Sequence, residues 1–311
     1  MKTILLTGSS GLLGGAINEA FEKMGLNILT PPRFMLDLNQ TISIKNYFQR
    51  NKIDCVIHCA AKVGGIQANL QNPAEFIFDN LRMDLNLLDA CNSSNIREFI
   101  FFGSSCMYPR DTHQPMSESQ ILTGKLEPTN ESYAVAKLAT AQMVKSLAIS
   151  GEKFYKTLVL SNLYGPGEDE DPRTSHLVGA IHSKYRKAIL TKSYEIEVWG
   201  SGTVRREFTH VRDVATWIAG NISNISEFPD IMNLGFGVDY SVKEYYEFFS
   251  NAYERDFKLK YDLLRPEGMP AKLLDSSAAR THFNWAPKIS PEQGIRDLVN
   301  LQLKGGAERH A

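Results

Sequence analysis

A glycine-rich turn near the N-terminus constrains the fold of this chain more than any other feature. Residues 2–7 (KTILLT) form an apolar run that predicts a buried strand, and residues 12–24 have the spacing of a helix. The turn between them has the pattern GxxGxxG, which allows a tight bend and a close approach of the backbone to a ligand. The helix N-terminus offers N–H groups and a positive dipole end to a pyrophosphate. We therefore predict a dinucleotide-binding turn made by Gly8, Ser10, Gly11, Leu12 and Gly14.

Apolar runs of strand length alternate with helical patterns through the first half of the chain. Further strands are predicted at residues 27–30, 55–59, 99–103 and 156–161, and long helices at residues 73–92 and 132–150. Strands that alternate with helices pair in parallel through right-handed crossovers. The first half therefore predicts an α/β fold with a doubly wound parallel sheet of the Rossmann type.

From about residue 165 the pattern becomes irregular, with many glycine, proline and charged residues. Short strands are predicted at residues 195–199 and 231–234, and helices at residues 211–221 and 242–253. We expect a smaller C-terminal α/β cap over the carboxyl edge of the sheet, where ligands of such folds bind. The predicted division is a cofactor-binding domain at residues 1–165, to which later segments return, and a mainly substrate-binding region at residues 166–311.

Composition and charge argue against several classes of function. The 311 residues carry a formal net charge of −1, which gives no electrostatic footprint for a nucleic acid or an anionic membrane surface. The N-terminal apolar run is too short for a transmembrane span. The four cysteines form no CxxC pair, which is typical of reduced thiols in a cytoplasmic protein. We expect a cytoplasmic protein with no nucleic-acid or membrane partner and no bound metal.

The second predicted strand indicates which dinucleotide binds. In a site for NAD, an acidic residue usually ends this strand and holds the ribose 2′-hydroxyl. Here the strand runs into ILTPPRF, with no acid and with Arg33 instead. A guanidinium suits a 2′-phosphate, and Ser9 or Ser10 can assist it, whereas the alternative is a plain surface arginine. The sequence favours NADP(H) over NAD.

A second pattern predicts the chemistry. Tyr133 and Lys137 form YxxxK in the predicted helix, one turn apart on one face, and Ser104 follows the strand at residues 99–103. Reduction of a ketone needs a proton for the developing alkoxide as hydride arrives. A free phenol has a pKa of about 10, and we expect the neighbouring ammonium and the oxidised nicotinamide to lower it. These three residues are the predicted reduction triad, and the tyrosine and lysine are also predicted cofactor contacts.

Five longer motifs are distributed over nearly the whole chain. They are AAKVGGI at residues 60–66, GSSCMYP at 103–109, LEPTNESYAVAK at 126–137, NLYGPG at 162–167 and VWGSGTVRREFTHV at 198–211. Together they resemble the GDP-L-fucose synthase family of extended short-chain dehydrogenases/reductases. The resemblance implies epimerisation at carbons 3 and 5 of GDP-4-keto-6-deoxymannose, followed by NADPH reduction at carbon 4.

The resemblance implies that Cys106 and His176 are the acid/base pair of the epimerisation. The protons on carbons 3 and 5 are acidified by the carbon 4 ketone, and a thiol and an imidazole both titrate near neutral pH. Without the family, Cys106 would be interpreted as a small buried hydrophobe and His176 as a loop histidine.

Further contacts and an assembly are implied in the same way. Ala60 and Ala61 would contact the cofactor. The implied contacts to the nucleotide sugar are Asn162, Lys184, Trp199, Arg206 and Lys272. Relatives pair through two long helices, which implies a homodimer through residues 73–92 and 132–150.

Three departures from the family pattern leave the substrate open. Residues 167–172 read GEDEDP where the family has a His-Asp-Asn-Phe run, Ala271 stands where arginine or lysine is frequent, and Lys184 replaces a common arginine. A reductase acting only at carbon 4 of a related GDP-4-keto-6-deoxy sugar, such as a heptose or a dideoxyhexose, is the main alternative. An NAD-recycling nucleotide-sugar 4-epimerase and a non-catalytic nucleotide-binding protein are weaker ones.

Overall fold

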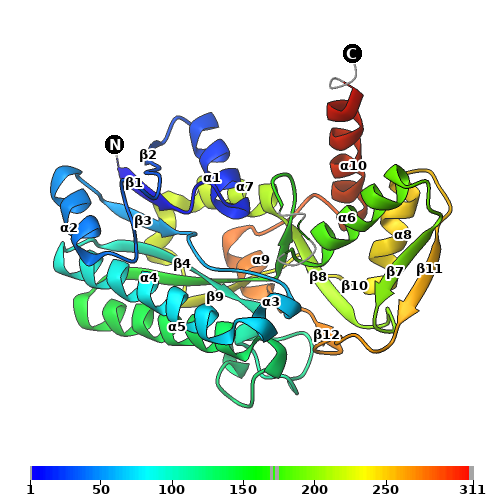
Figure 1. Cartoon of the computed structure of the whole chain (residues 1–311). Coiled ribbons are helices and arrows are strands. Elements are labelled where there is room, and N and C mark those ends of the chain that lie inside the picture. The colour runs from blue at the N-terminus through cyan, green and yellow to red at the C-terminus, as the bar shows by residue number, and fades with distance from the viewer. Residues whose placement is uncertain (1, 169–170, 172–174, 308–311) are drawn as a thin grey trace.

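The computed structural model describes residues 2–168, 171 and 175–307, and its centre is a six-stranded parallel sheet (Figure 1). The strand order is β2-β1-β3-β4-β5-β9. The strands are β1 (Thr3–Thr7), β2 (Asn27–Leu29), β3 (Cys55–His58), β4 (Glu98–Ser104), β5 (Phe154–Leu160) and β9 (Ile231–Leu234). The predicted doubly wound α/β class is confirmed, and the predicted strand bounds agree to within two residues.

Helices cover both faces of this sheet because its side chains alternate between two cores. Ile4 and Leu6 of β1 face the core shared with α1 (Leu12–Lys23) and α7 (Val211–Asn221). Leu5 faces the core on the opposite side. That side is covered by α2 (Thr41–Arg50), α4 (Pro73–Ser93) and α5 (Glu131–Gly151), with the short α3 (Ile66–Gln71) before α4 (Figure 1).

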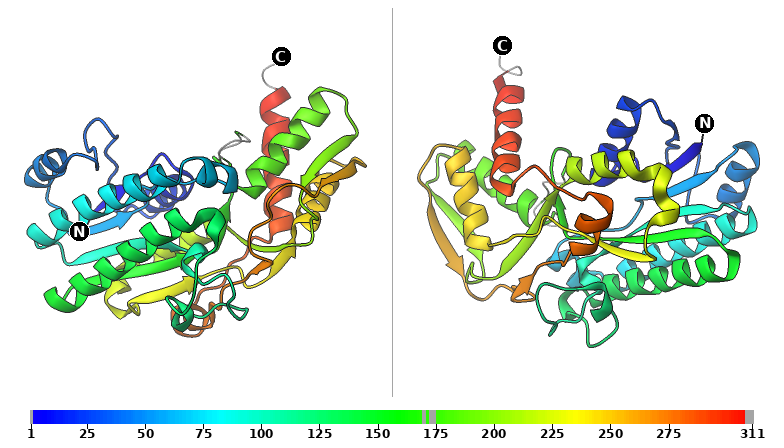
Figure 2. Two further views of the ribbon diagram at one scale, coloured as in Figure 1. Left: turned by 60° about the horizontal axis from the view of Figure 1, so that its bottom comes forward. Right: turned by 180° about the vertical axis from the view of Figure 1, so that it is seen from behind.

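The cap lies at one end of the sheet, as the two further views show (Figure 2). It has a hydrophobic core of its own. It contains the parallel pair β7 (Glu195–Trp199) and β11 (Lys258–Asp262), with α6 (Leu177–Leu190), α8 (Val242–Ala252) and α10 (Pro291–Ala307). Aromatic side chains such as Tyr185, Tyr245 and Phe249 fill this core. The helices α6 and α10 and the strand β11 were not predicted from the sequence.

Short strands form a junction between the cap and the central sheet. They are β6 (Asn162–Tyr164), β8 (Arg205–His210), β10 (Asp239–Ser241) and β12 (Ala271–Lys272), and α9 (Ser277–Phe283) then packs against β9. Glu207 on β8 is 1% exposed, and its two carboxylate oxygens accept hydrogen bonds from the backbone N–H groups of Gly237 (2.6 Å) and Leu274 (2.9 Å). Burial raises the pKa of this carboxyl to about 7. One buried side chain therefore ties together two segments that run between the regions.

The chain passes between the regions several times. After β7 it returns through β8 to α7 and β9, and after β11 it returns again to α9. The predicted boundary at residue 165 stays a prediction. Within the described part of the chain, no helix has the length and apolarity that crossing a membrane requires.

Candidate active site

The glycine turn has the geometry that its sequence predicts. Gly8 adopts a positive φ of +69°, and a Cβ placed on it would lie 2.6 Å from the backbone N of Ala60. A Cβ on Gly14 would lie 2.1 Å from the carbonyl oxygen of Gly8. Any side chain at either position would therefore push the turn away from β3 or from α1. These are the close approaches that a dinucleotide-binding turn requires.

A cavity of about 180 Å³ lies beside this turn. Ser10, Gly11 and Leu12 line it on one side, and Pro166, Gly167, Val211 and Arg212 on the other. The backbone N–H of Ala60 donates to the Thr7 hydroxyl oxygen (3.3 Å), so the start of the segment carrying Ala60 and Ala61 is fixed to the end of β1.

Arg33 lies in the segment that follows β2. Its side chain is 80% exposed, and its Nε is 3.7 Å from the Asp37 carboxylate. A separation of this length at an exposed pair is a weak interaction. The guanidinium is thus accessible to an anionic ligand, as the predicted 2′-phosphate contact requires.

The predicted triad meets at the carboxyl end of β4. Ser104 ends this strand, close enough to Tyr133 for its hydroxyl to act on the pKa of the phenol. The Lys137 ammonium donates to the Phe102 carbonyl oxygen (3.0 Å) and lies 5.8 Å from the centre of the Tyr133 ring. The long helix α5 therefore places both side chains beside the strand end, as the YxxxK spacing predicts.

The electrostatics of the triad differ from the expectation drawn from the sequence. Burial, more than any other influence, raises the pKa of the Tyr133 phenol, and Cys106 and Asp84 act in the same direction while Ser104 opposes them. Burial also lowers the pKa of Lys137, against the opposing charge of Asp84. We expected the lysine to lower the pKa of the phenol. In the protein without its cofactor, burial raises that pKa instead. The phenol is held in its neutral form, which is the form that donates a proton.

Cys106 lies next to the triad, in the short 3-10 helix at Ser105–Met107. Its sulfur accepts hydrogen bonds from the Asn130 side-chain amide (2.9 Å) and from the Lys272 ammonium (3.4 Å). Lys272 on β12 was predicted as a substrate contact, and the structure brings it to Cys106 instead of leaving it on the surface. The sulfur thus faces an amide donor and a positive charge.

His176 comes from a different segment. It is half-buried at the N-cap position of α6. The carbonyl oxygen of the preceding Ser175 lies 2.7 Å from where a Cβ on Gly65 would be. Ser175 therefore borders the AAKVGGI segment, and the pairing of His176 with Cys106 stays a prediction. Residues 169–170 and 172, which belong to the GEDEDP departure, lie outside the described residues.

The other predicted substrate contacts fall into two groups. At the junction, Arg206 donates to the carbonyl oxygens of Glu267 (2.7 Å) and Met269 (2.6 Å), and Asn162 donates to that of Glu207 (3.0 Å). The Arg206 guanidinium thereby anchors the 267–269 loop, and its predicted contact with the nucleotide stays a prediction.

The second group lies in the cap, around an indole ring. The Lys184 ammonium is 5.0 Å from the centre of the Trp199 ring, and the Arg265 guanidinium carbon is 4.7 Å from it. Lys184 also donates to the Glu197 carbonyl oxygen (2.8 Å). Burial lowers the pKa of Lys184 to about 8. This lysine therefore loses its charge at a pH where an ordinary surface lysine keeps it.

Comparison with known proteins identifies the family. The model described as "NAD dependent epimerase/dehydratase family" matches residues 4–235, which is most of the chain. This chain belongs to that family. Members share a nicotinamide-dependent chemistry, and the chain is accordingly an enzyme.

Individual relatives of this epimerase/dehydratase chain support the resemblance found in its motifs. A GDP-L-colitose synthase of Yersinia pseudotuberculosis is 39% identical over 293 residues, covering 94% of this chain and 95% of the relative. A GDP-L-fucose synthase of Azorhizobium caulinodans is 38% identical, covering 98% and 97%. The solved structure of a GDP-mannoheptose C4 reductase from Campylobacter jejuni with NADP bound is 27% identical, with a TM-score of 0.85 and coverage of 97% and 98%.

Two functional candidates in this epimerase/dehydratase site were missed by the sequence reasoning. Asn130 donates to the Cys106 sulfur, while its own Oδ1 is buried with no hydrogen-bond partner among the described residues. Glu127 is 3% exposed, and its Oε2 likewise has none, although Arg110 lies 3.5 Å away. Both precede Tyr133 within the LEPTNESYAVAK motif, and this position is the sequence feature that could have identified them as candidates. Among the described residues no cluster of three His, Cys, Asp or Glu side chains could hold a metal.

Proposed function

We propose that this chain is an NADPH-dependent 3,5-epimerase and 4-reductase of a GDP-linked 4-keto-6-deoxy sugar, similar to GDP-L-fucose synthase. The observation that carries the proposal is the place of Cys106. Its sulfur lies beside the reduction triad, with Asn130 and Lys272 as hydrogen-bond donors. A group that exchanges protons and a group that protonates the reduced ketone would therefore face the same sugar.

The chain's residues would divide the reaction between them. Cys106 would remove or return a proton at the carbons flanking the ketone, with His176 acting on the opposite face. Ser104 would orient the carbonyl oxygen through its hydroxyl, and Tyr133 would donate the proton that converts the alkoxide to the alcohol. The cofactor supplies the hydride to carbon 4. Lys137 would hold the tyrosine and the cofactor ribose in place.

The cofactor is NADP(H), as the sequence predicts. The close approaches at Gly8 and Gly14 fit a dinucleotide, and the Arg33 guanidinium is accessible for a 2′-phosphate. The solved reductase from Campylobacter jejuni contains NADP, which agrees with this choice.

A GDP-linked substrate is proposed from the relatives' names. The two curated relatives are named for different L-sugars, and the solved reductase for a heptose, but all three names begin with GDP. The nucleotide is the constant part and the sugar the variable one. Lys184, Trp199 and Arg206 would contact the nucleotide, because their charges and the indole face suit a diphosphate and a base.

The test is to run the reaction in deuterated water with NADPH and a GDP-4-keto-6-deoxy sugar, and to locate the label in the product. The wild-type enzyme is expected to place solvent deuterium at carbons 3 and 5. Cys106→Ser is expected to lose the label and still reduce the unepimerised ketone slowly. The absence of deuterium at either carbon in the wild-type product would contradict the epimerase part of the proposal.

A second candidate is a reductase that acts only at carbon 4. It is favoured by the solved neighbour, which is named as a C4 reductase, and by the departures at Lys184 and Ala271. In that case Cys106 and His176 would contact the sugar without exchanging its protons. The deuterium experiment separates the two candidates directly.

We also propose that the chain forms a homodimer through α4 and α5. Large apolar side chains are exposed on these two helices, with Phe78 at 64%, Leu85 at 54% and Ile149 at 70% exposed. A pairing of the two helices with those of a second copy would bury them. The cytoplasm is the proposed location, since all four cysteines are free thiols.

A further inference from the structure

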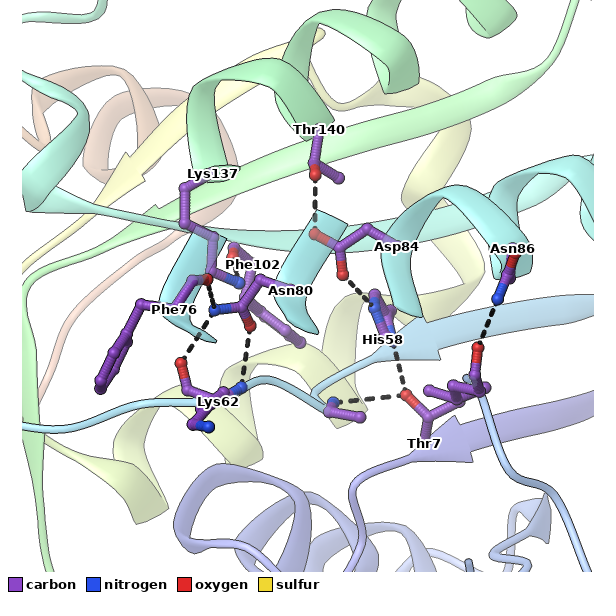
Figure 3. A network of polar contacts seen from close by, with 12 residues as sticks. Thr7, His58, Lys62, Phe76, Asn80, Asp84, Asn86, Phe102, Lys137 and Thr140 are labelled. Atoms are coloured by element: carbon purple, nitrogen blue, oxygen red, sulfur yellow. Dashed lines mark hydrogen bonds and ion pairs between the residues drawn. The ribbon is translucent and has the colours of Figure 1, made fainter. Parts of the chain in front are cut away.

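A chain of buried polar side chains runs from the end of β1, beside the cofactor turn, to the catalytic helix α5 (Figure 3). The Thr7 hydroxyl at the end of β1 is 2.7 Å from Nδ1 of His58 on β3. Nε2 of His58 is 2.9 Å from Oδ1 of Asp84 on α4, and the Thr140 hydroxyl on α5 donates to Oδ2 (2.6 Å). All four side chains are at most 3% exposed. A buried network of this kind needs every donor and acceptor to be matched.

The protons of this network can be assigned from its contacts. Thr7 Oγ1 accepts a hydrogen bond from the backbone N–H of Ala60, so its own hydrogen is available for His58 Nδ1. Nε2 then carries a hydrogen and donates it to Asp84, while Thr140 donates to the other carboxylate oxygen. The network is complete with a neutral imidazole. One negative charge, that of Asp84, is left without a compensating charge inside it.

Lys137 is a cation outside this network that acts on the Asp84 carboxylate. Thr140 lies three residues after Lys137 on α5, so both side chains are on the face of the helix that meets α4. Lys137 is 4% exposed and donates to a neutral carbonyl oxygen, that of Phe102. An ammonium ion buried against neutral groups alone would tend to lose its proton. Asp84 supplies the opposite charge from the neighbouring helix.

The other groups around Lys137 carry no charge. The Phe101 ring, whose centre lies 4.5 Å from the ammonium, supports the cation through its π face. Tyr133 stands one turn earlier on α5, and Cys59 after β3 is the remaining titratable group that acts on the lysine. Burial strongly raises the pKa of Cys59, so this thiol stays neutral. Burial also acts to raise the pKa of Asp84. The hydrogen bond from His58, the charge that this imidazole carries when protonated, the charge of Lys137 and the hydrogen bond from Thr140 together outweigh burial and lower the pKa, so the carboxylate stays ionised.

We propose that Asp84 is a positioning residue that keeps Lys137 charged and in place through a fixed counter-charge. The network holds that carboxylate from both sides, by Thr140 on the catalytic helix and by His58 and Thr7 on the strands that present the cofactor turn. A change in the position of the cofactor turn would therefore reach Asp84 through hydrogen bonds, and Lys137 through the charge of that carboxylate. The role of Asp84 in catalysis rests on the proposed function. Its effect on the charge of Lys137 does not, because that effect needs no substrate.

The direct test measures the titration of Lys137 without any substrate. Protein labelled with ¹³C at the lysine Cε atoms is titrated by NMR, and the Lys137 resonance is the one that disappears in Lys137→Met. In Asp84→Asn its titration midpoint is expected to fall by at least about one pH unit, because one opposite charge has been removed. Asp89→Asn makes the same substitution at an exposed position of the same helix and is expected to leave the midpoint unchanged.

Kinetics supply the second measurement. Reduction needs a charged Lys137, so activity is lost as the pH rises through its pKa, and in Asp84→Asn this basic limb of kcat/KM should move to lower pH. Thr140→Val keeps the carboxylate but removes one hydrogen bond, and it should shift the limb less. An unchanged Lys137 midpoint in both Asp84→Asn and Thr140→Val would overturn the proposal. If the wild type failed to oxidise NADPH with any keto sugar, the proposed function would fall while the NMR result would still decide this inference.

Discussion

The central sheet and the cap present their functional side chains in different ways. The triad stands on β4, with seven residues, and on α5, with 21, and both elements are packed into buried cores. Most candidate substrate contacts stand on short strands, namely β12, with two residues, β6, with three, β7, with five, and β8, with six, whereas Lys184 stands on the longer helix α6. Long packed elements hold atoms in fixed positions, whereas short strands and loops change with few consequences for stability. We therefore expect the reaction to depend on the long packed elements and the choice of sugar on the shorter ones.

The largest effect is expected in the central region, at the proton donor. Tyr133→Phe removes the hydroxyl and should lower the rate of ketone reduction about a thousandfold, the usual loss for a general acid. NADPH binding, measured by its fluorescence, should stay the same because the ring remains. Tyr194→Phe makes the same change at an exposed position near the cap and should have no effect. Near-normal turnover of Tyr133→Phe would remove the assignment.

The next effect concerns the cofactor and again belongs to the central region. Arg33→Ala should raise the KM for NADPH about thirtyfold more than that for NADH, since the loss of a charge-assisted contact to phosphate costs about 2 kcal/mol. The comparison is made from initial rates with each cofactor, and Arg50→Ala at the end of α2 serves as the control. Equal changes for both cofactors would show that Arg33 does not contact the 2′-phosphate.

A smaller effect should come from the titration of Lys184 in the cap, and it should change the KM for the GDP-sugar without changing kcat. Lys184 has a pKa lowered to about 8, so its charge is largely present at pH 7 and largely lost at pH 9. The KM for the GDP-sugar should therefore rise up to about tenfold over this range. Lys184→Arg keeps its charge and should flatten the rise while leaving kcat unaltered. The same pH dependence in Lys184→Arg would show that another group controls nucleotide binding.

The smallest effect concerns stability at the junction of the two regions. The pKa of Glu207 is raised to about 7, above the value of an unfolded glutamate, so the native state keeps the proton to higher pH than the unfolded state does. Stability from this group is present below the unfolded pKa and is lost as pH rises through about 7. The free energy of unfolding should fall by on the order of 1–3 kcal/mol between pH 5 and 8, and the thermal midpoint should fall with it by a few degrees. Glu207→Gln cannot titrate, and an equally steep fall in this variant would contradict the prediction.

The sequence predicted the parts of the fold that depend on local patterns. Periodicity located β4 and α5, and the spacing of Tyr133 and Lys137 placed the triad at the strand end. The sequence could not show that β9 is the sixth strand of the central sheet, because its partner strand β5 is more than 70 residues away in the chain. The support of Lys137 by Asp84 was hidden for the same reason. An acidic residue on a helix has no sequence signal for the lysine that it faces on another helix.

The repeated passage of the chain between its two regions has a consequence for how such enzymes diversify. The core of the cap is assembled from three separate stretches, around α6 and β7, around α8 and β11, and from α10. No single cut and splice can exchange it for the cap of a relative, since each graft would need several junctions inside packed structure. We therefore expect point substitutions in place to change the sugar preference with less damage to the packed core than an exchange of the cap.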